Sequence, residues 1–480
     1  MTILLTVAAY FAALMLFSRL TARRGDNNET FFRANRRSPW YMVAFGMVGA
    51  SISGITFVSV PGMVMRTDMT YVQTCIGFIL GYFAIAFLLL PVYYRLNLTT
   101  IYSYLKERLG KRSYKTGAWF FLTSKMTGAA VRFYVVCIIL QRFVFDAVGV
   151  PFPITVVGMT LLIWLYTRRG GIKTLVWTDT FQTTCMFAAL LLIIYNVTQQ
   201  LGMSVGEAVQ AVAADEHSRM FVWDDWVSTQ NFWKQLLSGA FIAIVMTGLD
   251  QDMMQKNLTC RNLREAQKDM CCYGLAFLPV NALFLGMGIL LYSLCAQQGI
   301  TPPATGDELL PWLVSSGTLG QWVIIPFTIG IVAAAFSSAD SAMTALTTTI
   351  CVDLLGISEE NEQQTLRRLV HIAVAVAFAL CILIFKVVGN DNILNAIYVM
   401  ASYTYGPLLG LYAFGLFTKR HIDDRFTPYI CLAAPLICGL LDHYAPLWWG
   451  YSFGYELLML NGLLTFGALW VNKCRLGLSQ

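Results

Sequence analysis

Charged residues are scarce in this sequence. They make up 12% of its 480 residues, while 57% are hydrophobic and 14% are aromatic. A soluble globular protein carries roughly a quarter charged residues. This composition excludes an ordinary soluble enzyme and indicates an integral membrane protein.

Ligands for transition metals are also few. The four histidines have no metal-ligand spacing, and the twelve cysteines are scattered through apolar stretches without a CxxC pair. The excess of 33 Lys and Arg over 27 Asp and Glu lies in short loops between apolar runs, which is typical of membrane topology. We therefore expect no zinc or haem site and no nucleic-acid partner.

Apolar runs near the ~20 residues of a membrane-spanning helix recur along the whole chain. They predict an all-α membrane protein with about thirteen spans, near residues 2–20, 39–64, 71–96, 117–144, 152–167, 172–196, 233–249, 268–296, 320–349, 365–388, 392–417, 426–445 and 453–473. Basic residues crowd the loops at 95–115 and 256–268, the second of which begins at Lys256, and are missing from 145–151 and 297–319. The positive-inside rule then predicts an outer N-terminus and a cytoplasmic C-terminus in the plasma (inner) membrane.

The second apolar run contains small and polar residues at membrane depth. Residues 49–56 read Gly-Ala-Ser-Ile-Ser-Gly-Ile-Thr, and Pro61 and Gly62 follow. Such a cluster favours local unwinding, which would free the carbonyls of Gly49 and Ile52 to bind a cation. Close helix packing through small residues is the alternative.

Carboxylates occur inside two of the apolar runs. Asp179 lies about two turns into the run at 172–196, where a charge is costly, so it needs either a buried salt bridge with an Arg or a bound sodium ion. A second run places hydroxyls and a carboxylate on one helical face, at Ser337, Asp340, Ser341, Thr344 and Thr348. Such hard oxygen ligands suit an alkali cation, although the hydroxyls could also serve helix–helix hydrogen bonding.

Two basic residues lie seven positions apart in the run at 117–144. Lys125 is near the inner end, where a lysine can extend its ammonium toward water. Arg132 is more central, so it should either pair with an acidic residue such as Asp179 or bind a substrate carboxylate with its planar guanidinium. The sequence leaves both alternatives open.

Three motifs together resemble the sodium:solute symporter family: Gly170-Gly171-Ile172 with Trp177-Thr178-Asp179 and Gln182, Ser337-Ser338-Ala339-Asp340-Ser341, and Tyr405-Gly406-Pro407. The resemblance covers nearly the whole chain and implies a secondary active transporter that works by alternating access, not an enzyme. It also implies inverted five-helix repeats with discontinuous helices, the LeuT-like fold. The single transporter domain at 1–480 would then comprise an extra helix at 2–20, repeats at about 39–196 and 233–417, and two C-terminal helices within 426–473.

The resemblance also implies sodium sites. Carried over by position, the family's common site would use Gly49, Ile52, Ala334, Ser337 and Ser338. A second site, which only some relatives have, would use Asp179, Ser337, Asp340 and Ser341, with Asp340 where Ser is more usual. The expected cofactor is therefore sodium, as one ion or two.

The substrate-binding residues implied by the resemblance are Ser51, Ser53, Thr56, Arg132 and, as a further polar contact, Gln73. The first four resemble the pattern in the family's sialic acid symporters, where an Arg receives the carboxylate. We therefore expect an anionic solute such as sialic acid, imported by a monomer in the lipid bilayer. The alternatives are a sodium-coupled sugar or polyol symporter and, in a different class, a transporter-like membrane sensor.

Overall fold

The computed structural model of the protein describes residues 2–21, 27–168, 170–226, 228–357, 363–388, 392–451, 453–454 and 456–472. Most of them are helical, and β-structure within these ranges is limited to one bridge between Ser38 and Cys260. The helices of the first half are α1 (Thr2–Thr21), α2 (Asn28–Arg33), α3 (Trp40–Ser51), α4 (Gly54–Thr67), α5 (Tyr71–Ala84), α6 (Leu90–Arg95), α7 (Ser103–Arg108), α8 (Lys111–Leu140), α9 (Phe152–Thr167), α10 (Ile172–Gln200) and α11 (Val205–Ala214). Those of the second half are α12 (Phe232–Ala243), α13 (Gln251–Asn257), α14 (Leu263–Gln297), α15 (Leu309–Ser315), α16 (Ile324–Thr349), α17 (Gln364–Val388), α18 (Asn392–Phe417), α19 (Thr427–Trp449) and α20 (Glu456–Val471). The predicted all-α class is confirmed.

Seven helical stretches in the described ranges are long and apolar enough to cross a membrane, and the bent pair α12–α13 would make an eighth. Outer helices expose apolar side chains four residues apart on one face: Val376, Leu380 and Ile384 on α17, and Leu432, Leu436 and Leu440 on α19. Such surfaces suit lipid rather than water. The count of thirteen spans stays a prediction.

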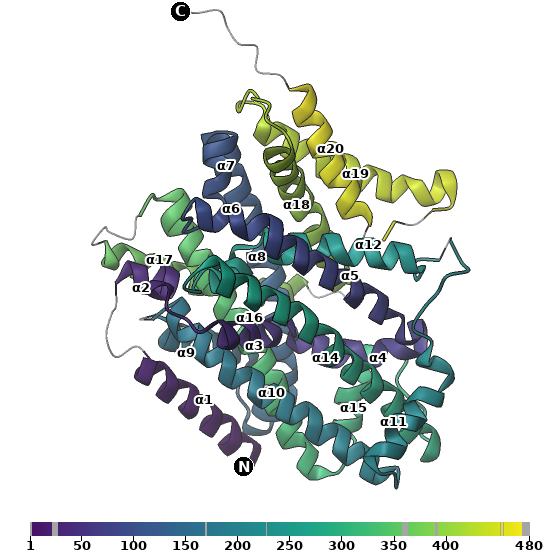
Figure 1. Ribbon diagram of the computed structural model, residues 1–480. Coiled ribbons are helices and arrows are strands. Elements are labelled where there is room, and N and C mark those ends of the chain that lie inside the picture. Colours follow the sequence, from purple (N-terminus) through teal and green to yellow (C-terminus); the bar gives the residue numbers. More distant parts are fainter. Residues whose placement is uncertain are drawn as a thin grey trace, which may run out of the picture.

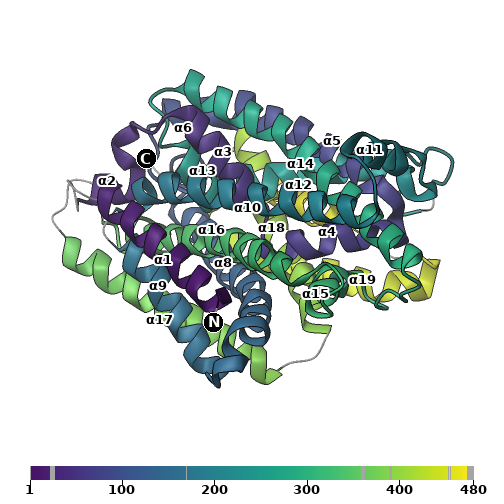
Figure 2. The ribbon, with the colours of Figure 1, turned by 90° about the horizontal axis from the view of Figure 1, so that it is seen from below.

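Helix α16 occupies the middle of the bundle (Figures 1 and 2) and packs against α10, α8, α4 and α3. All but a few of its side chains are buried. Helix α1 lies at the edge of the bundle against α9 and α10, while α18, α19 and α20 pack together at the opposite side (Figure 1). The central position of α16 puts its hydroxyl and carboxylate face inside the protein.

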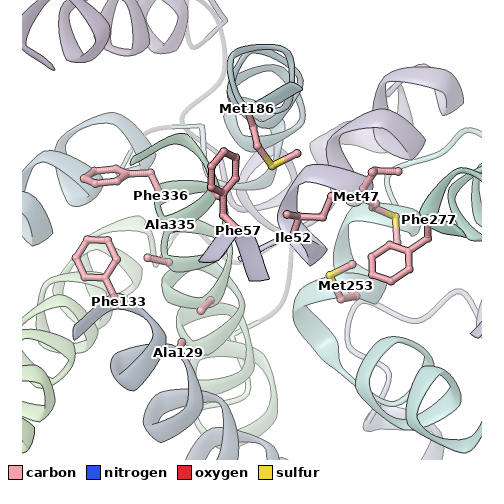
Figure 3. Packing of buried hydrophobic residues seen from close by; sticks show 14 of the residues in the cluster. Met47, Ile52, Phe57, Ala129, Phe133, Met186, Met253, Phe277, Ala335 and Phe336 are labelled. Carbon is pink, nitrogen blue, oxygen red and sulfur yellow. The ribbon is translucent and has the colours of Figure 1, made fainter. Parts of the chain in front are cut away.

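The second apolar run is broken as the sequence predicts. Helix α3 ends at Ser51 and α4 begins at Gly54, because Ile52 and Ser53 are extended. Figure 3 shows the apolar packing around this break, where Ile52 and Phe57 lie near Met186 of α10. The last helical bond of α3 runs from Ile52 N to Val48 O, so the carbonyls that follow Val48 lack helical N–H partners. Ser338 donates to the carbonyl of Ala50, the second of these carbonyls.

A second break was not predicted. Helix α12 continues through a π-helical turn (Ile244–Gly248), and α13 then sets off at an angle of 72° to it. Every residue of α13 is buried, including Lys256. The sequence prediction that Lys256 begins an inner loop is therefore wrong, because the break turns this segment back into the protein. Each of the two predicted repeats thus starts with a discontinuous helix.

Candidate functional site

A cavity of about 1160 Å³ lies between α4, α8, the α12–α13 break and α14. Its lining includes Ser51, Ser53, Thr56 and Arg132, four of the predicted substrate-binding residues. At one end it reaches the short helix η8 (Gly306–Glu308) and α15. The break between α3 and α4 thus opens onto a central chamber that extends toward the loop at 297–319.

Arg132 lines this cavity from α8 and is half-buried. It makes no hydrogen bond and no ion pair with any residue that the structure describes. Gly128, one turn away on the same helix, also lines the cavity, and a Cβ added there would meet nothing within 4 Å. Arg132 therefore adjoins open space. Its predicted alternative, pairing with Asp179, is not borne out, because Asp179 is paired with Lys256.

Lys125 also lines the cavity, but it does not extend toward water. Its Nζ lies 3.1 Å from Asp250 Oδ2 and 2.7 Å from Asp252 Oδ2, and Tyr405 donates a hydrogen bond of 2.7 Å to Asp250. Asp250 also caps α13, accepting from the backbone N–H of Asp252 at 2.8 Å. The prediction for Lys125 was wrong because its two acidic partners come from a break that the sequence did not reveal.

The hydroxyls beside the first break have partners within the protein. Ser51 Oγ lies 2.6 Å from Tyr273 OH, which in turn lies 2.9 Å from Tyr82 OH. Ser53 caps α4, accepting from Thr56 N at 3.3 Å. Both tyrosines line the cavity, and sequence reasoning missed them because nothing local distinguishes them from the other tyrosines of the chain.

Gln73 is fully buried and does not line the cavity. Its Nε2 donates to the carbonyl of Gln230 at 2.9 Å, and its Oε1 accepts from Val222 N at 3.0 Å. The structure therefore does not bring Gln73 to the other predicted substrate-binding residues. It ties α5 to the loop before α12.

The residues predicted for the first sodium site converge where α3 ends. Ser338 of α16 donates to the carbonyl of Ala50 at 3.0 Å and to that of Ala334 at 3.2 Å. The bond to Ala50 brings Ser338 to the end of α3, where Gly49 precedes Ala50 and Ile52 lies two residues after it. Ala334 lies one helical turn from Ser338. Ser337 instead donates to Asp179 Oδ1 at 2.9 Å. Carbonyl and hydroxyl oxygens of this kind fit a hard alkali cation.

The residues predicted for the second site are joined to one another and to protein partners. Asp179 Oδ2 lies 2.7 Å from Lys256 Nζ. Asp340 accepts from Tyr166 OH at 2.6 Å through Oδ2 and from Ser341 Oγ at 3.3 Å through Oδ1. Lys256 and Tyr166 are therefore two partners of these carboxylates that the sequence analysis did not identify.

A family model described as "Sodium:solute symporter family" matches residues 31–424. The chain belongs to the sodium:solute symporter family. It is therefore a multi-pass membrane transporter of a small solute that uses sodium ions, not an enzyme, as the motifs predicted.

The chain is similar to the sodium/sialic acid symporter SiaT of Proteus mirabilis, with 25% identity over 428 residues. The aligned region covers 86% of this chain and 84% of SiaT. The chain is also 24% identical over 413 residues to the human sodium/iodide cotransporter, covering 82% of this chain and 62% of the relative's length.

Solved structures agree on the fold. A substrate-bound, outward-open sodium-coupled sialic acid symporter superimposes with a TM-score of 0.81 at 20% identity, over 97% of this chain and 96% of the other. Mhp1, a nucleobase-cation-symport-1 family transporter, gives a TM-score of 0.61 at 14% identity, over 92% and 94% of the two chains. The predicted LeuT-like architecture is thereby confirmed.

Proposed function

We propose that this symporter imports a carboxylate, sialic acid, together with sodium. The observation that carries the proposal is Arg132, a guanidinium on the wall of the central cavity with no hydrogen-bonding or ion-pairing partner among the described residues. Guanidinium groups bind carboxylates through two parallel, charge-assisted hydrogen bonds. A cation left without a protein partner beside open space is suited to receive that group from a substrate.

The N-terminal end of helix α4, just after the break, also favours an anionic substrate. Its N-terminal residues Ser53 and Thr56 line the cavity, so the positive end of its dipole lies beside the same chamber. Helix N-termini at a broken membrane helix favour anionic substrate groups. The hydroxyls of Ser51, Ser53 and Thr56 supply polar contacts for the rest of a hydroxylated molecule.

The charges around the cavity include both signs. Lys125, Arg132 and Arg142 carry three positive charges, and Asp250, Asp252, Asp307 and Glu308 carry four negative ones, so the wall has no excess positive charge to compensate a bare anion. A carboxylate alone would add an uncompensated charge to a partly desolvated site, which is costly. Co-transport with one sodium ion restores the balance.

We place that sodium ion on the carbonyls of Gly49, Ile52 and Ala334 and the hydroxyls of Ser337 and Ser338. There it would tie the end of α3 to α16 and stabilise the state in which the cavity is open. Coupling then follows from the different affinity of sodium for the two conformations.

Because the cavity reaches the loop at 297–319, which the charge pattern assigns to the outside, we propose an outward-facing state, with the N-terminus outside and the C-terminus inside. We further propose that the monomer is the functional unit in the bilayer.

The test is binding of radiolabelled sialic acid to the purified protein in sodium chloride and in potassium chloride of equal concentration. We expect sodium-dependent binding that unlabelled glucose, pantothenate and lactate do not displace. Displacement by glucose, with no binding of sialic acid, would favour the sugar symporter instead. Displacement by pantothenate or lactate would keep the carboxylate class and change the substrate.

A further inference from the structure

A buried lysine lies beside the carboxylate predicted to bind a second sodium ion. Lys256 is 1% exposed, and its Nζ is 2.7 Å from Oδ2 of Asp179, which is itself 1% exposed. The other oxygen of Asp179 accepts a hydrogen bond from Ser337 at 2.9 Å. Both oxygens of this carboxylate therefore face protein donors.

Lys256 comes from a part of the chain that is distant in sequence from Asp179. Asp179 lies on α10 and Ser337 on the central helix α16, whereas Lys256 is near the end of α13, beyond the 72° break. Burial of the whole of α13 holds the lysine in place, and Gln255 fixes the helix further by donating to Thr348 of α16 at 2.9 Å. Packing of α13 thus fixes the Lys256 ammonium in the protein interior, beside Asp179.

We propose that the Lys256 ammonium occupies the position of a second sodium ion, so that this chain binds one sodium ion per substrate. A sodium ion at the predicted second site needs the oxygens of Asp179, Ser337, Asp340 and Ser341. The ammonium already neutralises Asp179, and a sodium ion beside it would meet a like charge. The hydroxyl of Ser341 is directed to Asp340, which also accepts from Tyr166.

This inference rests on the sodium coupling proposed above and specifies its stoichiometry. One sodium ion with one carboxylate carries no net charge, so transport would not respond to the membrane voltage. A second sodium ion would add one net charge, and about 100 mV acting on that charge changes the attainable accumulation roughly 50-fold. The lysine therefore determines whether the voltage contributes to uptake.

The primary experiment uses sodium alone. Equilibrium binding of sodium-22 to the purified protein should give one ion per wild-type chain and one for Lys256→Arg, which keeps the charge. Lys256→Ser removes the ammonium and leaves space beside Asp179, so it should bind two. Two ions on the wild-type chain, or one ion on both the wild type and a folded Lys256→Ser variant, would overturn the inference.

Folding of the variants is controlled in two ways. Lys256→Ser leaves Asp179 without a cation, so its melting temperature should rise more steeply with sodium concentration than that of the wild type. The double variant Lys256→Gln with Asp179→Asn removes both charges, and it should fold and bind one ion, like the wild type. A double variant that binds none would mean that Asp179 is a sodium ligand in the wild type, which contradicts the inference.

Failure of the proposed function gives a different result. If the wild type binds no sodium while Lys256→Ser binds one, the first sodium site is wrong and the role of Lys256 stands. If neither binds sodium, both fail. Where uptake is measurable, an inside-negative potassium diffusion potential should stimulate uptake by Lys256→Ser and leave the wild type unchanged.

Discussion

Replacing Arg132 by alanine is the sharpest perturbation of the proposed substrate site. A bidentate pair with a carboxylate comprises two charge-assisted hydrogen bonds, each contributing roughly 1.5–3 kcal/mol. Their loss amounts to about 3–6 kcal/mol, which corresponds to a roughly 10²- to 10⁴-fold weaker affinity. Arg132→Lys keeps the charge and one bond, so we expect a loss of roughly 10- to 100-fold.

The structure provides a reason to expect that these variants fold. Arg132 has no hydrogen bond or ion pair among the described residues, so its removal leaves no buried group there without a partner. Arg142, which lies just beyond the last residue of α8, is a matched control. It lines the same cavity as Arg132, but its side chain is exposed whereas Arg132 is half-buried. Arg142→Ala should bind sialic acid within about threefold of the wild type.

The assay is the dissociation constant of sialic acid for the purified protein in sodium chloride, with the monomer peak on size-exclusion chromatography as the check of folding. An Arg132→Ala variant that elutes as a folded monomer and binds within threefold of the wild type would refute the assignment. A large loss for Arg142→Ala with none for Arg132→Ala would move the carboxylate to the outer end of the cavity.

Three further changes test other parts of the site. Ser338→Ala removes the hydroxyl that bonds the end of α3, and should lower the apparent sodium affinity of uptake roughly three- to tenfold while Ser338→Thr retains it; unchanged sodium dependence would contradict the first sodium site. Gly128→Phe should obstruct the part of the cavity beside Arg132 and abolish substrate binding but not sodium-22 binding, whereas Gly128→Ala should preserve both. Full substrate binding by the Phe variant would place the substrate elsewhere. Lys125→Met should lower the free energy of unfolding by about 3 kcal/mol, because Asp250 and Asp252 lose their cation. Adding Asp252→Asn should recover part of the thermal stability. A Lys125→Met variant as stable as the wild type would show that these ion pairs do not stabilise the fold.

Local features of the sequence predicted what depends on local physics. The Gly and Ser residues at 49–54 have low helix propensity, and the structure breaks the helix there, at Ile52 and Ser53. The hydroxyl and carboxylate stripe of α16 follows from helical periodicity, and the central position of that helix buries it. Asp179 needed a cationic partner because a lone buried carboxylate is too costly, and the structure supplies one.

Partners distant in sequence could not be predicted in the same way. Lys256 follows an apolar run and precedes several basic residues, so its charge fits the pattern of an inner loop. Only the bend between α12 and α13 turns Lys256 toward Asp179. The sequence at this bend has fewer Gly and Pro residues than the break between α3 and α4, so it was not predicted. Gln73 shows the converse: the family resemblance implied a substrate contact, but in the structure the side-chain amide bonds to loop backbone.

The measurement that tests sodium-coupled carboxylate import most directly is uptake of labelled sialic acid into proteoliposomes under an inward, tenfold sodium gradient. With one sodium ion per carboxylate, the gradient supplies about 1.4 kcal/mol, so the internal concentration should transiently exceed the external one, up to a limit of about tenfold. The excess should vanish when sodium is equal on both sides. Uptake that proceeds equally under a potassium gradient, or that never exceeds the external concentration, would contradict the account.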